Sequence, residues 1–283
     1  MNRIYLDYAA TTPVDPLVLE AMQPYFSEKF ANPSSLHSAG QEAKKALTEA
    51  RQQVATILSC TAQEVVFLSG GTEGNNLAIF GIADKHSSGH IITSAIEHES
   101  VLEPIKELEK RGFRTTFLPV GNNGIVNPED LQSALTDDTI LVSIMSANNE
   151  IGTIQPIAEI ATILRDHSAV FHVDACQSLP KTLEGIDLLT LNGGKIYGPK
   201  GVGLLYVRDG IKLQPRVFGG GHERGLRSGT ENIPAIIGLA KALALPHHDN
   251  EIASLRDQLL NGITSELDQI TVNGDLAARL PNN

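Results

Sequence analysis

The stretch that decides the fold of this chain is DLLTLNGGKIYGPKGVG, residues 187–203. An apolar run from Ile186 to Leu191 ends in Asn192 and two glycines, and Lys195 follows at once. After further glycine and proline positions a second apolar run covers residues 204–207. This pattern predicts a buried strand, a tight polar turn and a return strand, with one lysine at the turn. A desolvated lysine there can offer its amine to a carbonyl carbon. A glycine-rich hairpin with a solvated lysine is the alternative that this stretch leaves open.

Three further stretches supply chemistry that a lysine turn lacks. Residues 65–76 are typical of a strand, a glycine turn and a helix start, with Thr72 at the start of the helix. Residues 170–177 form a strand that carries Asp174 near its carboxyl end, and residues 95–100 contain His98 between two glutamates. A strand-end acid, a helix N-terminus, a histidine and a lysine are the parts that a pyridoxal phosphate site needs.

From residue 65 onward, strand-like and helix-like segments alternate. Strands are expected at 65–68, 90–93, 114–118, 139–146 and 169–175, with helices at 72–83, 101–111, 128–135 and 156–167. Further helices are expected at 16–26, 39–59, 233–245 and 249–267, and a new strand at 270–274. The alternation predicts an α/β fold with a mostly parallel central sheet and helices on both faces.

Ligands of open α/β sheets bind at the carboxyl ends of the strands. Several polar residues follow the expected strand ends directly: Thr72, His98, Asn149, Asp174 and Gln177. Their common position favours a binding site over unrelated loop residues.

Composition narrows the classes of function. The 283 residues are 41% hydrophobic and 19% charged, and no apolar run reaches the roughly 20 residues that span a bilayer. A net charge of −11 argues against a nucleic-acid partner, and two cysteines argue against a disulfide framework. An acid as early as Asp7 argues against a signal peptide, so a cytoplasmic location is expected. No metal site is expected, because His86 and His90 share a helical spacing only across a loop.

Seven motifs, in order along essentially the whole chain, resemble those of the cysteine desulfurases, a family within the class V pyridoxal-phosphate enzymes. They lie at residues 5–12, 69–73, 97–98, 148–152, 173–175, 195–201 and 227–230. The resemblance implies fold type I, pyridoxal 5′-phosphate as cofactor and L-cysteine as substrate. The implied products are L-alanine and an enzyme persulfide, whose sulfur a further protein accepts for iron–sulfur cluster assembly or tRNA thiolation. Another class V activity, selenocysteine lyase or aminotransferase, is the alternative on this scaffold.

The resemblance also implies roles for individual residues. Lys195 is expected to form the Schiff base, Asp174 to pair with the pyridinium nitrogen, and His98 to stack on the ring. The remaining cofactor contacts are expected from Gly71, Thr72, Asn149, Gln177, Asn192 and Thr230. Thr230 matches a residue that reaches the phosphate of a neighbouring subunit, which implies a homodimer. The alternatives are Lys200 as the reactive lysine, a strand-end cap for Asp174 and an ordinary loop histidine for His98.

This sequence departs from the family pattern at two places. Asn192-Gly193-Gly194 stands where a serine, a small residue and a histidine usually precede the lysine. The family's mobile cysteine loop and its arginine for the substrate carboxylate have no counterpart here. The chain is therefore expected to be a fragment, inactive by itself or a non-catalytic cofactor-binding remnant, and Cys176 is expected to be a packed small side chain. The expected parts are an arm at 1–15, a cofactor domain at 16–248 and the beginning of a small α+β domain at 249–283.

Overall fold

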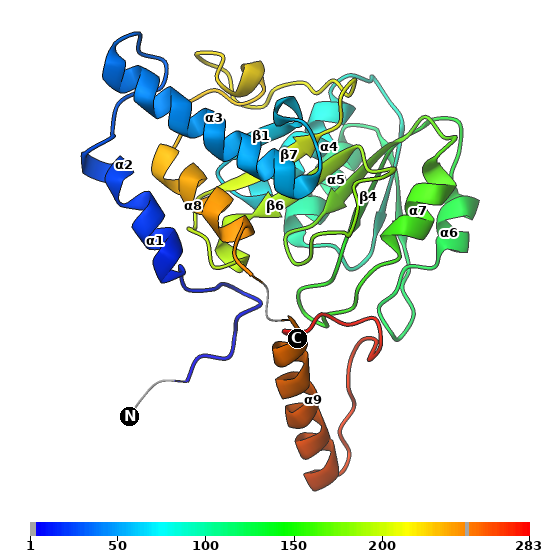
Figure 1. Ribbon diagram of the computed structural model, residues 1–283. Coiled ribbons are helices and arrows are strands. Elements are labelled where there is room, and N and C mark those ends of the chain that lie inside the picture. The colour runs from blue at the N-terminus through cyan, green and yellow to red at the C-terminus, as the bar shows by residue number, and fades with distance from the viewer. Residues whose placement is uncertain (1–3, 247–248) are drawn as a thin grey trace.

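A mixed sheet runs through the middle of the protein, as seen in the computed structural model (Figure 1), which describes residues 4–246 and 249–283. Within the described residues this sheet has seven strands. They are β1 (Val65–Leu68), β2 (His90–Ser94), β3 (Arg114–Leu118), β4 (Thr139–Met145), β5 (Val170–Asp174), β6 (Leu188–Asn192) and β7 (Gly203–Val207). The expected strand, turn and return strand around Lys195 are present, because β6 and β7 pair antiparallel with Asn192 opposite Gly203.

The strand order places all the expected polar strand ends on one edge. The order is β1-β7-β6-β5-β4-β2-β3, and only β7 runs against the others. The carboxyl ends of β1, β2, β4, β5 and β6 therefore meet at the same edge of the sheet. The predicted α/β class with a mostly parallel sheet is confirmed.

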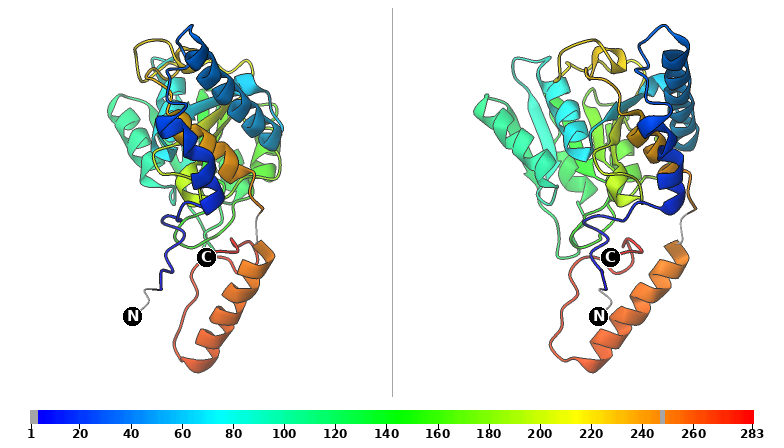
Figure 2. Two further views of the ribbon diagram at one scale, coloured as in Figure 1. Left: turned by 60° about the vertical axis from the view of Figure 1, so that its left-hand side comes forward. Right: turned by 90° about the vertical axis from the view of Figure 1, so that its left-hand side faces the viewer.

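Helices cover both faces of the sheet, as the alternation predicts (Figures 1 and 2). One face carries α3 (Ser38–Leu58), α6 (Pro128–Ala134), α7 (Ile157–Leu164) and α8 (Ile233–Leu243). The other face carries α4 (Gly71–Ala83) and α5 (Glu99–Lys110). Alternate residues of the strands feed the two cores: Val65 and Phe67 pack on the α3 side, whereas Val66 and Leu68 pack on the α4 side. Burying one such side chain contributes about 1.5–3 kcal/mol.

The N-terminal segment differs in one detail from the sequence prediction. The helix expected at 16–26 is two helices, α1 (Pro16–Met22) and α2 (Pro24–Ser27). Pro24 has no backbone N–H to continue the first helix, so the chain restarts there. Residues 1–3 of the expected arm lie outside the described residues, as do residues 247–248 at the expected domain boundary.

The C-terminal segment projects away from the sheet (Figure 2). Helix α9 (Asp249–Glu266) has no buried residue, and Leu255 and Leu259 of its apolar stripe are 66% and 60% exposed. The strand expected at 270–274 is wrong: this segment is irregular, because no strand of the described structure lies beside it to complete a ladder. Instead the chain returns to the body, where Ile154 N donates to Ala278 O at 2.8 Å. Among the described residues, no helix is both long and apolar enough to cross a membrane.

Candidate active site

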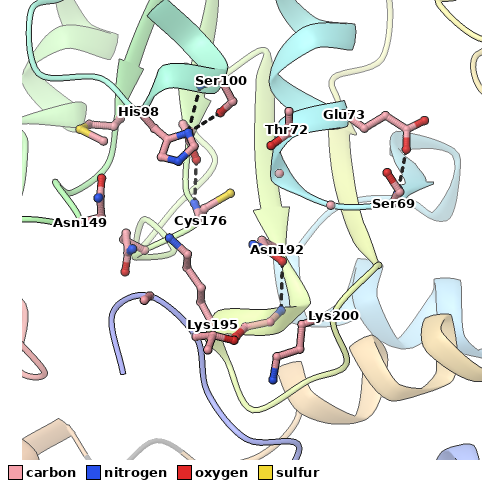
Figure 3. Close-up of a pocket in the computed structure, with 18 of the residues that line it drawn as sticks. Ser69, Thr72, Glu73, His98, Ser100, Asn149, Cys176, Asn192, Lys195 and Lys200 are labelled. Atoms are coloured by element: carbon pink, nitrogen blue, oxygen red, sulfur yellow. Dashed lines mark hydrogen bonds between the residues drawn. The ribbon is translucent and has the colours of Figure 1, made fainter. Parts of the chain in front are cut away.

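A cavity of about 330 Å³ opens at the shared edge where the parallel strands end (Figure 3). This volume lies within the usual range for small-molecule sites. All but one of the predicted site residues line it: Gly71, Thr72, His98, Asn149, Asp174, Gln177, Asn192 and Lys195. Thr230 is the exception, since it lies exposed on the loop after Arg227.

The lysine turn is built by glycine and one asparagine. The strand β6 passes into a short 3-10 turn, η2 (Gly193–Lys195), and Asn192 Oδ1 accepts a hydrogen bond from Gly194 N at 3.0 Å. A Cβ atom on Gly193 would lie 2.9 Å from Pro199 O, so the return loop can pass this close only to a glycine. Lys195 then extends into the cavity, and Asn192 retains only its Nδ2 group for donation.

Lys195 and Lys200 are distinguished by their partners. Lys200 Nζ donates to Thr12 O of the N-terminal segment. Lys195 has no hydrogen bond or ion pair from its amine to any other described residue, although it faces the same cavity. The free amine is therefore that of Lys195.

The N-terminal arm straps this turn from outside. Thr12 N and Thr12 Oγ1 both donate to Gly194 O, at 2.9 and 3.2 Å, and Tyr197 N donates to Thr12 Oγ1 at 2.8 Å. Gln177 Nε2 donates to Ala9 O at 3.1 Å, which ties the arm to the other side of the cavity. The arm thus holds both the lysine turn and the segment after β5.

The start of helix α4 offers unpaired donors to the cavity. Its N-cap is Gly70, which has no side chain to cap the first turn, and Gly74 N is the first amide that bonds back, to Gly70 O at 3.1 Å. The amides of Gly71 and Thr72 therefore stay open at a positive helix end that suits a phosphate. A Cβ atom on Gly71 would lie 2.5 Å from Cys176 Sγ, so a larger residue here would force the Cys176 side chain to move.

Asp174 is a buried carboxylate without a cation. It is 5% exposed, its Oδ1 accepts from Cys176 N at 3.0 Å and its Oδ2 accepts from Asn75 Nδ2 at 2.7 Å. No described Lys, Arg or His forms an ion pair with it. Buried charges are normally paired, so this carboxylate suits a cationic group in the cavity, as a protonated pyridine nitrogen would be. The donor set and the cavity fit pyridoxal phosphate.

A second carboxyl group lies buried behind the cavity. Burial, and to a lesser degree the charge of Asp174, raise the pKa of Glu97 to about 8. Its Oε1 accepts from Ser94 Oγ at 2.5 Å and from Met145 N at 2.9 Å, while its buried Oε2 has no partner among the described residues. Glu97 thus holds its proton near neutral pH.

His98 begins helix α5 and stands at the cavity wall (Figure 3). Its Nδ1 accepts from Ser100 N at 3.0 Å and lies 2.8 Å from Ser100 Oγ. Asn149, which also lines the cavity, donates from Nδ2 to Glu150 Oε1 at 2.6 Å. His98 therefore uses one ring nitrogen for the protein and turns the rest of the ring to the cavity.

Neither cysteine is prepared as a thiolate. Burial raises the pKa of the Cys176 thiol well above its ordinary value, and the charge of Asp174 raises it further. Burial also raises the pKa of Cys60 to about 11. Cys176 lies just past β5 against Gly71, where it is half-buried and lines the cavity.

Comparison with known proteins identifies the scaffold. Residues 4–281 match the model of the aminotransferase class-V family. The chain belongs to this family. As a class-V member it is 48% identical to the cysteine desulfurase IscS of Dictyoglomus turgidum, over all of this chain and 75% of that protein. It is 46% identical to the putative cysteine desulfurase IscS 1 of Bacillus subtilis, over all of this chain and 78% of that protein.

Two solved structures agree with the fold. A NifS-like protein superimposes with a TM-score of 0.95 at 39% identity, covering 99% of this chain and 80% of the other. SspA, solved in complex with cysteine, gives 0.87 at 41% identity, covering 92% and 78%. The expected relationship to the cysteine desulfurases is confirmed, and with it the dependence on pyridoxal phosphate that this family shares.

Sequence reasoning missed two kinds of residue. Asn75 and Ser100 support Asp174 and His98 from behind, and Thr11 lines the cavity from the arm. The spacing of Asn75 three residues after Thr72 places both on one side of a helix, which was the available signal. The contact of the arm leaves no local pattern, because it joins residues 182 apart.

Proposed function

We propose that this chain binds pyridoxal 5′-phosphate through Lys195 and uses it on L-cysteine, as a cysteine desulfurase. The observation that carries this proposal is that two groups line the same cavity. One is the Lys195 amine, which has no hydrogen bond to a described residue, and the other is the buried Asp174 carboxylate, which has no ion pair with one. The kinship with proteins named cysteine desulfurases supports the choice of reaction, and the neighbour solved with cysteine supports the choice of substrate.

Different residues would hold different parts of the cofactor. The open amides of Gly71 and Thr72 and the Nδ2 group of Asn192 would hold the phosphate. Asp174 would pair with the ring nitrogen, His98 would lie on a face of the ring, and Asn149 and Gln177 would reach the ring substituents. When bound, the cofactor supplies an electron sink that makes the substrate's α-proton acidic.

Lys195 Nζ would bond the cofactor, and the same amine, when free, would move the substrate's α-proton. Asp174 would keep the ring nitrogen protonated. Loss of sulfur from L-cysteine to a thiolate leaves L-alanine and a persulfide on that thiol. Because burial raises the pKa of Cys60 and of Cys176, we assign the sulfur-accepting thiol to neither of them, and a thiol of another molecule would take the sulfur.

The wider setting is proposed on the same basis. We place the protein in the cytoplasm, with a separate protein as final sulfur acceptor. We also propose a homodimer in which the exposed loop of Thr230 reaches the phosphate end of the neighbouring cavity. Within one chain, Arg227 connects this loop to the helix start that would bind the phosphate, since Arg227 Nε lies 3.0 Å from Glu73 Oε1.

The test is chemical mapping of the cofactor. Borohydride reduction of the cofactor-loaded protein, followed by peptide mass spectrometry, should place the adduct on Lys195. Lys195→Ala should lose the adduct and the cofactor absorbance, whereas Lys200→Ala, the matched control, should keep both. An adduct on Lys200 in the unaltered chain would refute the assignment.

A further inference from the structure

The start of helix α5 fixes which nitrogen of His98 carries the ring proton. His98 is the N-cap of this helix, and its Nδ1 accepts the hydrogen bond from Ser100 N at 3.0 Å. A backbone N–H can only donate, so Nδ1 must present its lone pair. The ring proton of neutral His98 therefore sits on Nε2, the nitrogen that the helix cap does not use.

Ser100 points its hydroxyl group in a defined direction. Its Oγ lies 2.8 Å from Asn75 Nδ2 and 2.8 Å from His98 Nδ1. An amide nitrogen only donates, so Ser100 Oγ accepts from Asn75 and has its single hydrogen left for His98. The hydroxyl group thus reinforces the same tautomer that the helix cap selects.

Asn75 in turn is oriented by Asp174. The second hydrogen of Asn75 Nδ2 goes to Asp174 Oδ2 at 2.7 Å. Turning the amide over would place its oxygen against the carboxylate, which can only accept, so the orientation follows from the contact with Asp174. Asn75 is fully buried, and its Oδ1 has no partner among the described residues. An unpaired buried acceptor destabilises a fold, so the side chain is not explained by stability.

These contacts form one chain with a fixed direction, from Asp174 through Asn75 and Ser100 to His98. We propose that Asn75 and Ser100 are positioning residues that couple the carboxylate facing the cofactor nitrogen to the ring of His98, and keep His98 Nε2–H turned toward the cavity. The role of this chain in catalysis rests on the proposed function, but the hydrogen bonds themselves need no cofactor. His98 is then a donor at Nε2 when the substrate arrives.

The first measurement uses the protein without cofactor. In ¹⁵N-histidine-labelled protein, long-range ¹H–¹⁵N NMR should show His98 with a bare Nδ1 and a protonated Nε2, the signal being assigned by its loss in His98→Gln. In Ser100→Ala the Nδ1-protonated form should gain population, whereas Ser100→Thr, which keeps the hydroxyl group, should restore the original pattern. A proton on Nδ1 in the unaltered protein would overturn the proposal.

The second measurement tests the coupling through Asn75, whose described hydrogen bonds go to Ser100 and Asp174 and not to His98. Asn75→Ala should shift the His98 nitrogen signals and weaken pyridoxal phosphate binding roughly tenfold, because Asp174 loses one of its two donors. The matched control is Asn76→Ala, whose amide donates to Thr72 O in the same helix and should leave the His98 signals in place. Unmoved His98 signals in a folded Asn75→Ala protein would also overturn the proposal.

The two proposals fail in different ways. If pyridoxal phosphate does not attach to Lys195 but the His98 signals behave as described, the proposed function fails and the positioning chain stands. If the cofactor attaches to Lys195 and the His98 signals ignore Asn75 and Ser100, the positioning chain fails alone.

Discussion

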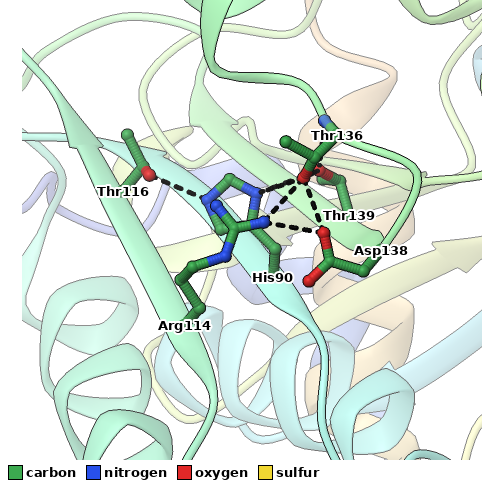
Figure 4. Close-up of polar contacts among 6 residues, drawn as sticks. All are labelled: His90, Arg114, Thr116, Thr136, Asp138 and Thr139. Carbon is green, nitrogen blue, oxygen red and sulfur yellow. Dashed lines mark hydrogen bonds and ion pairs between the residues drawn. The ribbon is translucent and has the colours of Figure 1, made fainter.

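His90 and His98 lie at the two ends of strand β2, and they differ in how many of their ring nitrogens form hydrogen bonds within the protein. His90 begins β2, is fully buried, and has hydroxyl groups at both nitrogens, Thr139 Oγ1 at 2.9 Å and Thr116 Oγ1 at 2.7 Å (Figure 4). His98 follows the other end of β2, and among the described residues hydrogen bonds reach only its Nδ1. A histidine in a polar cluster is therefore structural when both nitrogens are bonded, and available for chemistry when one still faces a cavity.

The acids of the two clusters differ in the same way. Beside His90, Asp138 is paired with Arg114 at 2.7 Å and is exposed (Figure 4). Asp174 is buried, accepts only from neutral donors, and forms no ion pair with any described residue. The cluster around His90, at the amino ends of the strands, contains both the acid and its cationic partner. The cluster around His98 and Asp174, at the carboxyl ends, contains the acid but no described cation paired with it.

The largest effect should come from removing the charge that lacks a partner. Asp174→Asn keeps the shape of the side chain but not its charge. It should slow exchange of the α-hydrogen of L-alanine for deuterium by about 10²-fold, because the ring nitrogen would lose its proton. Proton NMR of L-alanine in D₂O with cofactor-loaded protein measures this rate. Asp138→Asn is the control and should exchange normally; an equal loss in both variants would contradict the comparison.

Replacing each histidine separately should distinguish an effect on the free energy of unfolding from an effect on the rate of α-hydrogen exchange. His90→Leu should lower the free energy of unfolding by about 1–3 kcal/mol, because the threonine hydroxyl groups lose a buried partner, and should leave cofactor affinity unchanged. His98→Gln should change stability by about 1 kcal/mol or less and slow α-hydrogen exchange. Urea unfolding and the exchange assay test both. A His90 variant that folds normally but loses exchange would reverse the assignment.

Because of Glu97, the free energy of unfolding should fall as the pH rises from about 6.5 to 8. The folded protein holds this proton up to about pH 8, whereas the unfolded chain releases it near the ordinary carboxyl pKa, so rising pH favours unfolding. Over 1.5 pH units the loss is about 2 kcal/mol. Burial lowers the pKa values of His90 and of His172, the latter to about 4, so their contributions are lost only as the pH falls below about 6.5.

The matching variant is Glu97→Gln, which carries no titrating proton. Urea midpoints measured at intervals from pH 6.5 to 8 should decline in the unaltered protein and stay level in the variant. Parallel declines in the two proteins would assign the pH dependence to another group.

The smallest effect should come from the ion pair that closes the His90 cluster. Arg114→Met removes the partner of Asp138, but both side chains are about half exposed, at 48% and 59%. Exposed pairs contribute about 0–1 kcal/mol, and salt screens them. Urea unfolding at low and high salt should show a difference within that range. A loss above 2 kcal/mol would mean that the cluster depends on this charge.

The sequence was sufficient for the sheet and for most of the cavity because both follow from local patterns. Strand-like segments separated by helix-like ones predicted every strand from residue 65 to 207, and polar residues at strand ends predicted the cavity wall. The strand at 270–274 was wrong because Ile270 and Val272 have a β pattern but no neighbouring strand. Asn75 was missed because a polar residue inside a helix does not reveal which distant carboxylate it meets.

The strap of the N-terminal arm across the lysine turn bears on the order in which this protein folds. Thr12 meets Gly194 across 182 residues of chain, so their contact closes one of the longest loops in the molecule. Contacts of such separation form late, after the local helices and the first parallel strands. While the ribosome is still making residues 100–190, neither Lys195 nor β7, the strand that pairs with β1 beside the phosphate end, exists. Competence to capture the cofactor should therefore arise in one late step, when the N-terminal segment meets the lysine turn.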